Sequence, residues 1–141
     1  MKKAKKKSHL LTSESKSTRH AVTPGRHIAQ VDIDRKSDLA LFKRHFFVLN
    51  ARMKLYRESA GDVFAISIPV FTRSDIRRSS NHGNHWHVEV ISSQGLNKAE
   101  RIALQAALGS DRKRELLSLC RYFAGSRYPT LFFEERKCKS S

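Results

Sequence analysis

Residues 79–90, Ser-Ser-Asn-His-Gly-Asn-His-Trp-His-Val-Glu-Val, contain the side chains of this chain that are best suited to chemistry. A polar segment with one glycine leads into an expected strand, in which His85, His87 and Glu89 alternate with apolar residues. Because successive side chains of a strand point to opposite faces, these polar groups share one face. An apolar back and a front of imidazole and carboxylate groups are typical of a strand at the floor of a reactive or metal-binding site.

A second polar pair lies in residues 27–34, which we expect to form a short strand. Asp32 and Asp34 are two residues apart and therefore share a face, with apolar residues on the other. Two neighbouring carboxylates repel each other unless a cation joins them, and the hard ions Mg²⁺ and Mn²⁺ prefer oxygen ligands. The alternative is that both acids lie at an exposed strand end and pair with Arg35 and Lys36.

The charge of the chain favours a polyanionic partner. There are 28 Lys and Arg residues against 13 Asp and Glu residues, a net charge of +15. Residues 1–27 contain eight basic side chains and one acidic side chain, so the remainder of the chain is still +8. Release of counterions rewards such a surface with affinity for nucleic acid that does not depend on base sequence. We expect DNA or RNA as the partner.

Other classes are disfavoured by what the sequence contains. No apolar run approaches the length of about 18 residues that a membrane span needs. The basic start, residues 1–7, is not followed by an apolar segment of signal-peptide length. Cys120 and Cys138 are the two cysteines, and they form neither a zinc-binding pattern nor a disulfide framework. We therefore expect an intracellular, cytoplasmic protein.

The apolar pattern predicts an α+β domain over residues 28–136, after a disordered basic tail at residues 1–27 and before a short tail at residues 137–141. A helix with Ser37 or Asp38 as its expected N-cap has one apolar stripe at spacings of three and four. The expected elements, in order, are strand 27–34, this helix to residue 60, strands 63–69 and 85–91 with a short arm at 74–80, helices 97–108 and 110–123, and strand 130–134. The stripe consists of Leu39, Phe42, Phe46, Leu49 and Met53.

This succession, βαββαβ, predicts a ferredoxin-like or RRM-like antiparallel sheet with helices on one face. In such a sheet the first and third strands are neighbours, so Asp32 and Asp34 would face His85 and His87. Trp86 would face the helices. The last strand would add an acid, either Glu134 or Glu135.

Carboxylates, imidazoles and arginines are the groups that metal-assisted phosphoryl transfer uses. Arg77 and Arg78, just before the polar segment, are candidates for holding a triphosphate or a backbone phosphate. They are equally compatible with ordinary solvated residues.

Three short motifs together resemble the catalytic core of archaeo-eukaryotic primase-like (primase-polymerase) proteins. They are Val-Asp-Ile-Asp at 31–34, Ser-Asn-His-Gly-Asn-His-Trp-His at 80–87 and Phe-Phe-Glu at 132–134. The resemblance implies metal binding by Asp32 and Asp34, with Glu134 as a third ligand, and places His87 against the phosphates of a nucleoside triphosphate. Ser80, Asn84 and His85 of the second motif would contact nucleotide or nucleic acid. The implied activity is nucleotidyl transfer in DNA replication with Mg²⁺ or Mn²⁺.

Two alternatives stay open. The sequence His85-Trp86-His87 fits the His-hydrophobe-His motif of HUH-type single-strand nickases, in which Tyr122 on a later helix would attack the phosphodiester and Tyr128 would be a less suitable nucleophile. The other alternative is a non-catalytic DNA- or RNA-binding accessory protein, whose binding would depend on salt but not on Asp32, Asp34 or His87.

Overall fold

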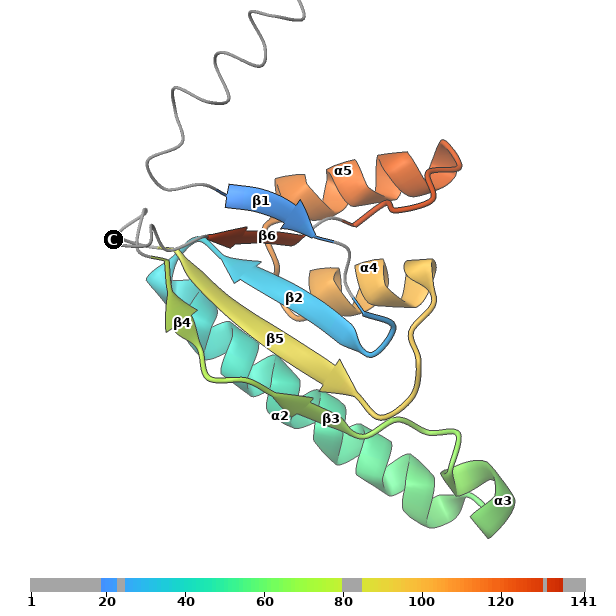
Figure 1. The fold of residues 1–141 in the computed structure, drawn as a ribbon. Helices are drawn as coiled ribbons and strands as arrows, with labels where there is room; N and C mark the ends of the chain where they lie inside the picture. Colours follow the sequence, from blue (N-terminus) through green and yellow to red (C-terminus); the bar gives the residue numbers. More distant parts are fainter. Residues whose placement is uncertain (1–18, 23–24, 80–84, 131, 136–141) are drawn as a thin grey trace, which may run out of the picture. The chain divides into compact units, whose positions relative to one another are not determined.

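The computed structural model describes residues 19–22, 25–79, 85–130 and 132–135 (Figure 1). These residues belong to two compact units. The smaller unit contains strands β1 (Arg19–Val22) and β6 (Phe132–Glu135), which pair antiparallel with Val22 opposite Phe132. The larger unit extends to Thr130 and contains every other element.

The larger unit is built on a four-stranded antiparallel sheet, which confirms the mixed α+β class. Strand β2 (Ile28–Ile33) pairs with one side of β5 (Trp86–Ser92). The short strands β3 (Phe71–Arg73) and β4 (Arg77–Arg78) pair with the other side of β5. The strand order β2-β5-β3 is the order expected for the first three strands of the predicted sheet.

A bulge separates β3 from β4. Arg73 is opposite Val90 and Arg77 is opposite His87, so the edge strand has one residue more than β5 over this interval. Ser74 fills the irregular position, because its hydroxyl oxygen accepts a 2.9 Å hydrogen bond from the backbone N–H of Glu89. The predicted short arm at 74–80 is thus present as β4, in register with the histidines.

One face of the sheet packs on helix α2 (Lys36–Ser59), which runs behind β5 and β3 in Figure 1. Val31, Val88 and Phe42 are fully buried in this core. Trp86 and the remaining members of the predicted apolar stripe pack against it, as expected. The predicted N-cap, Ser37 or Asp38, was wrong: Arg35 is the N-cap, since its backbone is extended and the helix begins at Lys36.

Two further helices follow β5. Helix α4 (Lys98–Ala107) begins with a capping box: the Asn97 side chain accepts from the N–H of Glu100 at 2.8 Å, and the Glu100 carboxylate accepts from the N–H of Asn97 at 2.9 Å. Gly109, at φ +90°, adopts the left-handed conformation that favours glycine and reverses the chain. Helix α5 (Arg112–Phe123) then starts with Asp111 as its N-cap.

The outer edge of β2 is hydrogen-bonded to this helical pair and not to a strand. The N–H of Gln30 donates to the Gln105 side chain at 3.0 Å, and the carbonyl of Gln30 accepts from Arg114 at 2.8 Å. The N–H of Asp32 donates to the Ser110 hydroxyl at 3.2 Å, and its carbonyl accepts from the Asp111 N–H at 2.8 Å. The backbone groups of β2 that another strand would pair with therefore already have hydrogen-bond partners.

The ferredoxin-like arrangement is accordingly not confirmed. The last strand, β6, pairs with β1 in the smaller unit and does not join the four-stranded sheet. The sequence analysis did not predict β1, whose residues lie in the segment 1–27. Apart from residues 19–22 and 25–27, the tail expected to be disordered lies outside the described residues, as do residues 137–141.

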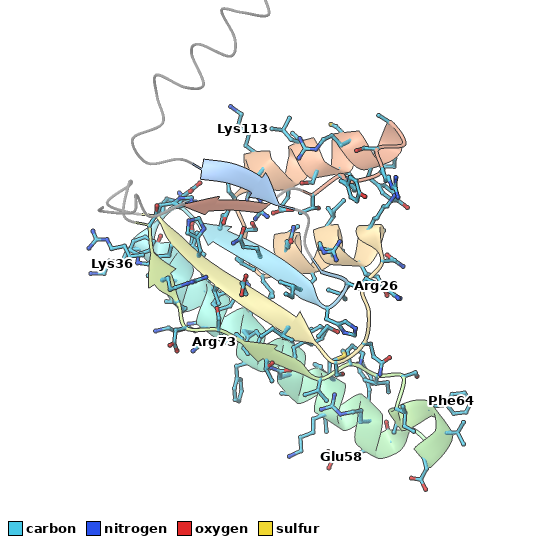
Figure 2. All side chains as sticks on the ribbon, in the orientation of Figure 1. Arg26, Lys36, Glu58, Phe64, Arg73 and Lys113 are labelled. Atoms are coloured by element: carbon cyan, nitrogen blue, oxygen red, sulfur yellow. The ribbon has the colours of Figure 1, made fainter. Side chains whose placement is uncertain are left out.

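The strand predicted over residues 63–69 was wrong. Asp62–Ala65 form a short helix, α3, in which the N–H groups of Phe64 and Ala65 donate to the carbonyl of Gly61. The apolar composition suggested a strand, but β5 ends at Ser92 opposite Phe71, so earlier residues have no partner strand. Val63 and Phe64 remain 82% and 70% exposed, and Figure 2 shows Phe64 pointing away from the sheet.

No helix in the described part of the chain is both long enough and apolar enough to cross a membrane.

Replacing Gln105 with leucine should lower the free energy of unfolding by about 2–4 kcal/mol, because two buried partners would lose their hydrogen bonds. The fully buried Gln105 side chain accepts from Gln30 and donates to Glu115 at 2.8 Å. Urea denaturation would measure the change. Gln94→Leu is the matched control, since it removes one exposed hydrogen bond to Ile66 and should cost about 0.5 kcal/mol or less. Equal stability of the two variants would contradict this account of the β2 edge.

Candidate functional site

Two acid–imidazole pairs lie side by side on the sheet face opposite α2. Asp32 is directly across from His87 in the β2–β5 ladder, and the Asp32 Oδ1 to His87 Nδ1 distance is 2.7 Å. Asp34, just beyond β2, pairs with His85, with 2.6 Å between Oδ1 and Nδ1. The prediction that the two acids face the two histidines is thus confirmed. It follows from the period of two along each strand and from the antiparallel register.

The hydrogen bond to Asp32 sets the orientation of the His87 ring and which of its nitrogens faces the carboxylate. An ionised carboxylate can only accept, so Nδ1 carries the proton, and Nε2 of the neutral ring keeps its lone pair. The same arrangement orients many metal-binding and catalytic histidines. The His85 and His87 rings touch edge to face, with their centroids 4.8 Å apart; His85 directly precedes β5 and lies two residues before His87.

A buried charged network supports Asp32 from the side of α5. Arg114 Nη1 lies 3.2 Å from Asp32 Oδ2 and 3.3 Å from Glu115 Oε2, and it also donates to the Ser110 hydroxyl at 3.1 Å. The other oxygen of Glu115 accepts from Gln105 at 2.8 Å. This network joins the site to the helices that satisfy the edge of β2.

Sequence reasoning missed Arg114 and Glu115. Leu116 and Leu117 of α5 are 59% and 47% exposed, whereas Glu115 is 4% exposed, so the buried face of this helix is not its leucine face. The sequence feature that could have indicated them is the Arg-Glu pair in the first turns of the helix that follows Gly109. This helix packs beside β2, where Arg114 bonds the Gln30 carbonyl.

The surroundings shift two carboxyl pKa values in opposite directions. Burial raises the pKa of Asp32, but the hydrogen bond from His87 and the positive charge of Arg114 outweigh it, so the pKa lies below its usual value. Burial raises the pKa of Glu115, and the neighbouring Arg114 and Gln105 offset this only in part. Asp32 is therefore a stable anion at neutral pH.

Asp32, His85 and His87 could hold a metal ion. Each offers one ligand atom, and these atoms all lie within 4.8 Å of one another. One carboxylate and two imidazoles are a common ligand set for divalent transition metals, and all three residues are partly accessible to solvent. Asp34 is next to this group through its contact with His85, and its side chain is 47% exposed.

The predicted arginines differ in their placement. Arg77 is opposite His87 in the β4–β5 pairing, so it extends the row Asp32–His87 across the same face of the sheet. Arg78 is opposite Trp86, which belongs to the other face. Both arginines are exposed. Ser80 and Asn84 lie outside the described residues.

Asp34 also lines a cleft of about 560 Å³ between the start of α2 and the α4–α5 turn. Arg35 and Arg112 contribute positive charge to this cleft, and Asp38 and Asp111 contribute negative charge. The cleft adjoins the acid–imidazole pairs and offers space beside them for a polar ligand.

The predicted third acid belongs to the smaller unit. Glu134 of β6 is opposite His20 of β1, and Glu135 is opposite Arg19. Its role as a third ligand stays a prediction.

Tyr122 lies along α5 from the site. It is eight residues beyond Arg114, which corresponds to about 12 Å along a helix axis. It lines a groove with Arg26 and Gly95, at the ends of β2 and β5 that are remote from the Asp32–His87 pair.

No protein-family model matches this chain, and neither a curated protein nor a solved structure matches it.

Proposed function

We propose that the chain binds Mg²⁺ or Mn²⁺ beside Asp32 and Asp34 and catalyses nucleotidyl transfer on a nucleic acid, in the manner of primase-polymerase proteins. The observation that carries the proposal is the meeting of Asp32 with His87 and of Asp34 with His85 on the sheet face opposite α2. A divalent ion at such a site neutralises phosphate charge and activates the attacking oxygen.

The residues have distinct roles in this proposal. Asp32 and Asp34 supply oxygen ligands, and Arg114 holds Asp32 in place at 3.2 Å. His87, whose Nδ1 is held by Asp32, would donate a hydrogen bond from Nε2 to a phosphate oxygen of the incoming nucleotide when its ring carries both protons. Arg77, in the same row, attracts the remaining phosphate charge. The excess of basic residues retains the nucleic-acid strand.

The metal-binding triad also favours a second candidate, the HUH-type nickase, because two histidines of a His-hydrophobe-His strand and one acid of the neighbouring strand converge. This reaction needs a tyrosine within reach of the metal-bound phosphodiester. The position of Tyr122, about 12 Å further along α5 than Arg114, argues against it. Nucleotidyl transfer makes use of Asp34, which the nickase leaves without a task.

One experiment separates these functions from passive binding. Nucleotide incorporation and strand nicking would be measured with Mg²⁺ or Mn²⁺ for the wild type, Asp34→Ala, His87→Ala and Tyr122→Phe. We expect Asp34→Ala and His87→Ala to lower incorporation at least about 100-fold, and Tyr122→Phe to retain it. Asp75→Ala is the matched control, because Asp75 is exposed between β3 and β4.

Other results would contradict the proposal. A covalent protein–DNA adduct that disappears only in Tyr122→Phe would establish the nickase. Binding of nucleic acid that is the same in all variants, with neither product formed, would identify a non-catalytic binding protein.

A further inference from the structure

A second groove of about 820 Å³ lies at the other end of the strands from the acid–imidazole pairs. Its walls come from the residue that precedes β2, from the β5–α4 connection with the start of α4, and from the chain around the end of α5. Figure 2 labels Arg26 at this end of the larger unit. The volume is within the usual range of small-ligand sites, about 300–1,000 Å³.

Positive charge dominates the lining. Arg26, Lys98 and Arg127 border the groove, and none of them pairs with a carboxylate in the described part of the chain. Lys98 makes a long contact of 3.4 Å to the carbonyl of Ser126. The carboxylate of Glu100 also borders the groove, but it accepts the capping hydrogen bond from Asn97. The groove therefore has cations available for an anionic ligand.

Aromatic rings lie beside these cations. Tyr122 and Tyr128 line the groove and are 37% and 50% exposed. The guanidinium of Arg127 is 5.4 Å from the centre of the Tyr128 ring, so a ligand in the groove could contact a cation and an aromatic ring at the same place. This is the combination that binds a phosphate and stacks a nucleic-acid base.

A buried hydroxyl in the lining has no partner of its own. Thr130 is 2% exposed and borders the groove, and its Oγ1 has no hydrogen-bond partner among the described residues. A buried hydroxyl without a partner is costly, and native structures rarely retain one without a reason. A ligand with polar atoms in the groove would supply that partner.

We propose that this groove binds a nucleotide unit, with its phosphate held by Arg26, Arg127 and Lys98 and its base stacked on Tyr128. The unit comes from a single strand of nucleic acid or from a free nucleotide, since both present the same phosphate and base. The groove contains no residue of the acid–imidazole pairs, so its ligand binds without a divalent ion. The inference goes beyond nucleotidyl transfer and stands independently of it.

The test measures binding by the full chain in excess EDTA, with a fluorescent single-stranded oligonucleotide and with fluorescent ATP. Arg26→Ala/Arg127→Ala should weaken binding at least about tenfold and reduce the slope of log K against log salt by about 0.7, since one contacted phosphate of a single strand contributes about that much. The control Arg44→Ala/Arg52→Ala removes the same charge from exposed positions of α2. Equal weakening in both double variants would overturn the proposal.

Two further variants test the base and the hydroxyl. Tyr128→Leu should weaken binding about fivefold or more through lost stacking. Thr130→Val keeps the shape of the side chain, so the unliganded protein should be at least as stable as the wild type while binding weakens. Unchanged affinity in both variants would overturn the assignment.

The two probes identify the source of the nucleotide. Loss confined to the oligonucleotide in Arg26→Ala/Arg127→Ala would assign the groove to a strand, and equal loss with ATP would assign it to a free nucleotide. Because EDTA removes divalent ions, failure of this test leaves nucleotidyl transfer at Asp32 and Asp34 unaffected.

Discussion

Asp32→Asn is expected to lower the affinity of the chain for Mn²⁺ at least about 100-fold. Asparagine keeps the size of the side chain but removes the negative charge that joins His87 and Arg114. Because Asp32 is ionised at neutral pH, the substitution removes a full charge from the centre of the site. Isothermal titration calorimetry or the electron paramagnetic resonance signal of free Mn²⁺ would measure the loss.

The matched control for this prediction is Asp75→Asn. Asp75 is an exposed acid on the opposite edge of the same sheet, between β3 and β4, so its substitution changes the net charge equally without touching β2. We expect its Mn²⁺ affinity to stay within about twofold of the wild type. If Asp32→Asn also stayed within that range, the convergence of Asp32 with the two histidines would not be a metal site.

Arg114→Leu is expected to lower the free energy of unfolding by about 3–5 kcal/mol, because it leaves the buried Glu115 and the half-buried Asp32 without their cation. Arg114 contacts both Asp32 and Glu115, and it also donates to the Gln30 carbonyl at the edge of β2. Its side chain is 14% exposed, so water cannot fully replace these contacts. Urea denaturation at neutral pH would measure the change.

Two further variants show whether the buried charge is the cause. Arg112→Leu makes the same substitution at an exposed position of α5 and should change stability by about 0.5 kcal/mol or less. Arg114→Leu/Glu115→Leu removes the stranded carboxylate together with its cation and should recover part of the lost stability. A loss below about 1 kcal/mol in Arg114→Leu would mean that the network contributes little to the fold.

Local sequence patterns were sufficient to predict those features that depend only on residues close in the sequence. The capping box at Asn97 formed because its two hydrogen bonds join residues three apart. The α2 stripe was found from its helical period, and the shared faces of Asp32 with Asp34 and of His85 with His87 followed from the period of two in strands. These features depend on neighbours within one turn or one strand.

Other predictions were wrong because the partners of these segments are distant in sequence. The apolar run at 63–69 has the composition of a strand, but β5 ends opposite Phe71 and leaves these residues no strand to pair with. They form a helical turn instead, through hydrogen bonds to the carbonyl of Gly61. The last strand was predicted from its pattern, but its partner is β1, a strand that the sequence analysis did not predict. Composition describes a segment and does not specify its partner.

The sequence by itself determined which residues can do chemistry and which of them share a strand face, because the alternation of side chains is a property of the local backbone. Only the tertiary structure decided that Asp32 lies opposite His87, that Arg114 reaches Asp32 from α5, and that a cationic groove lies around Arg26. Strand register and the turn at Gly109 create these contacts, and both are set by burial and hydrogen bonding summed over the whole unit.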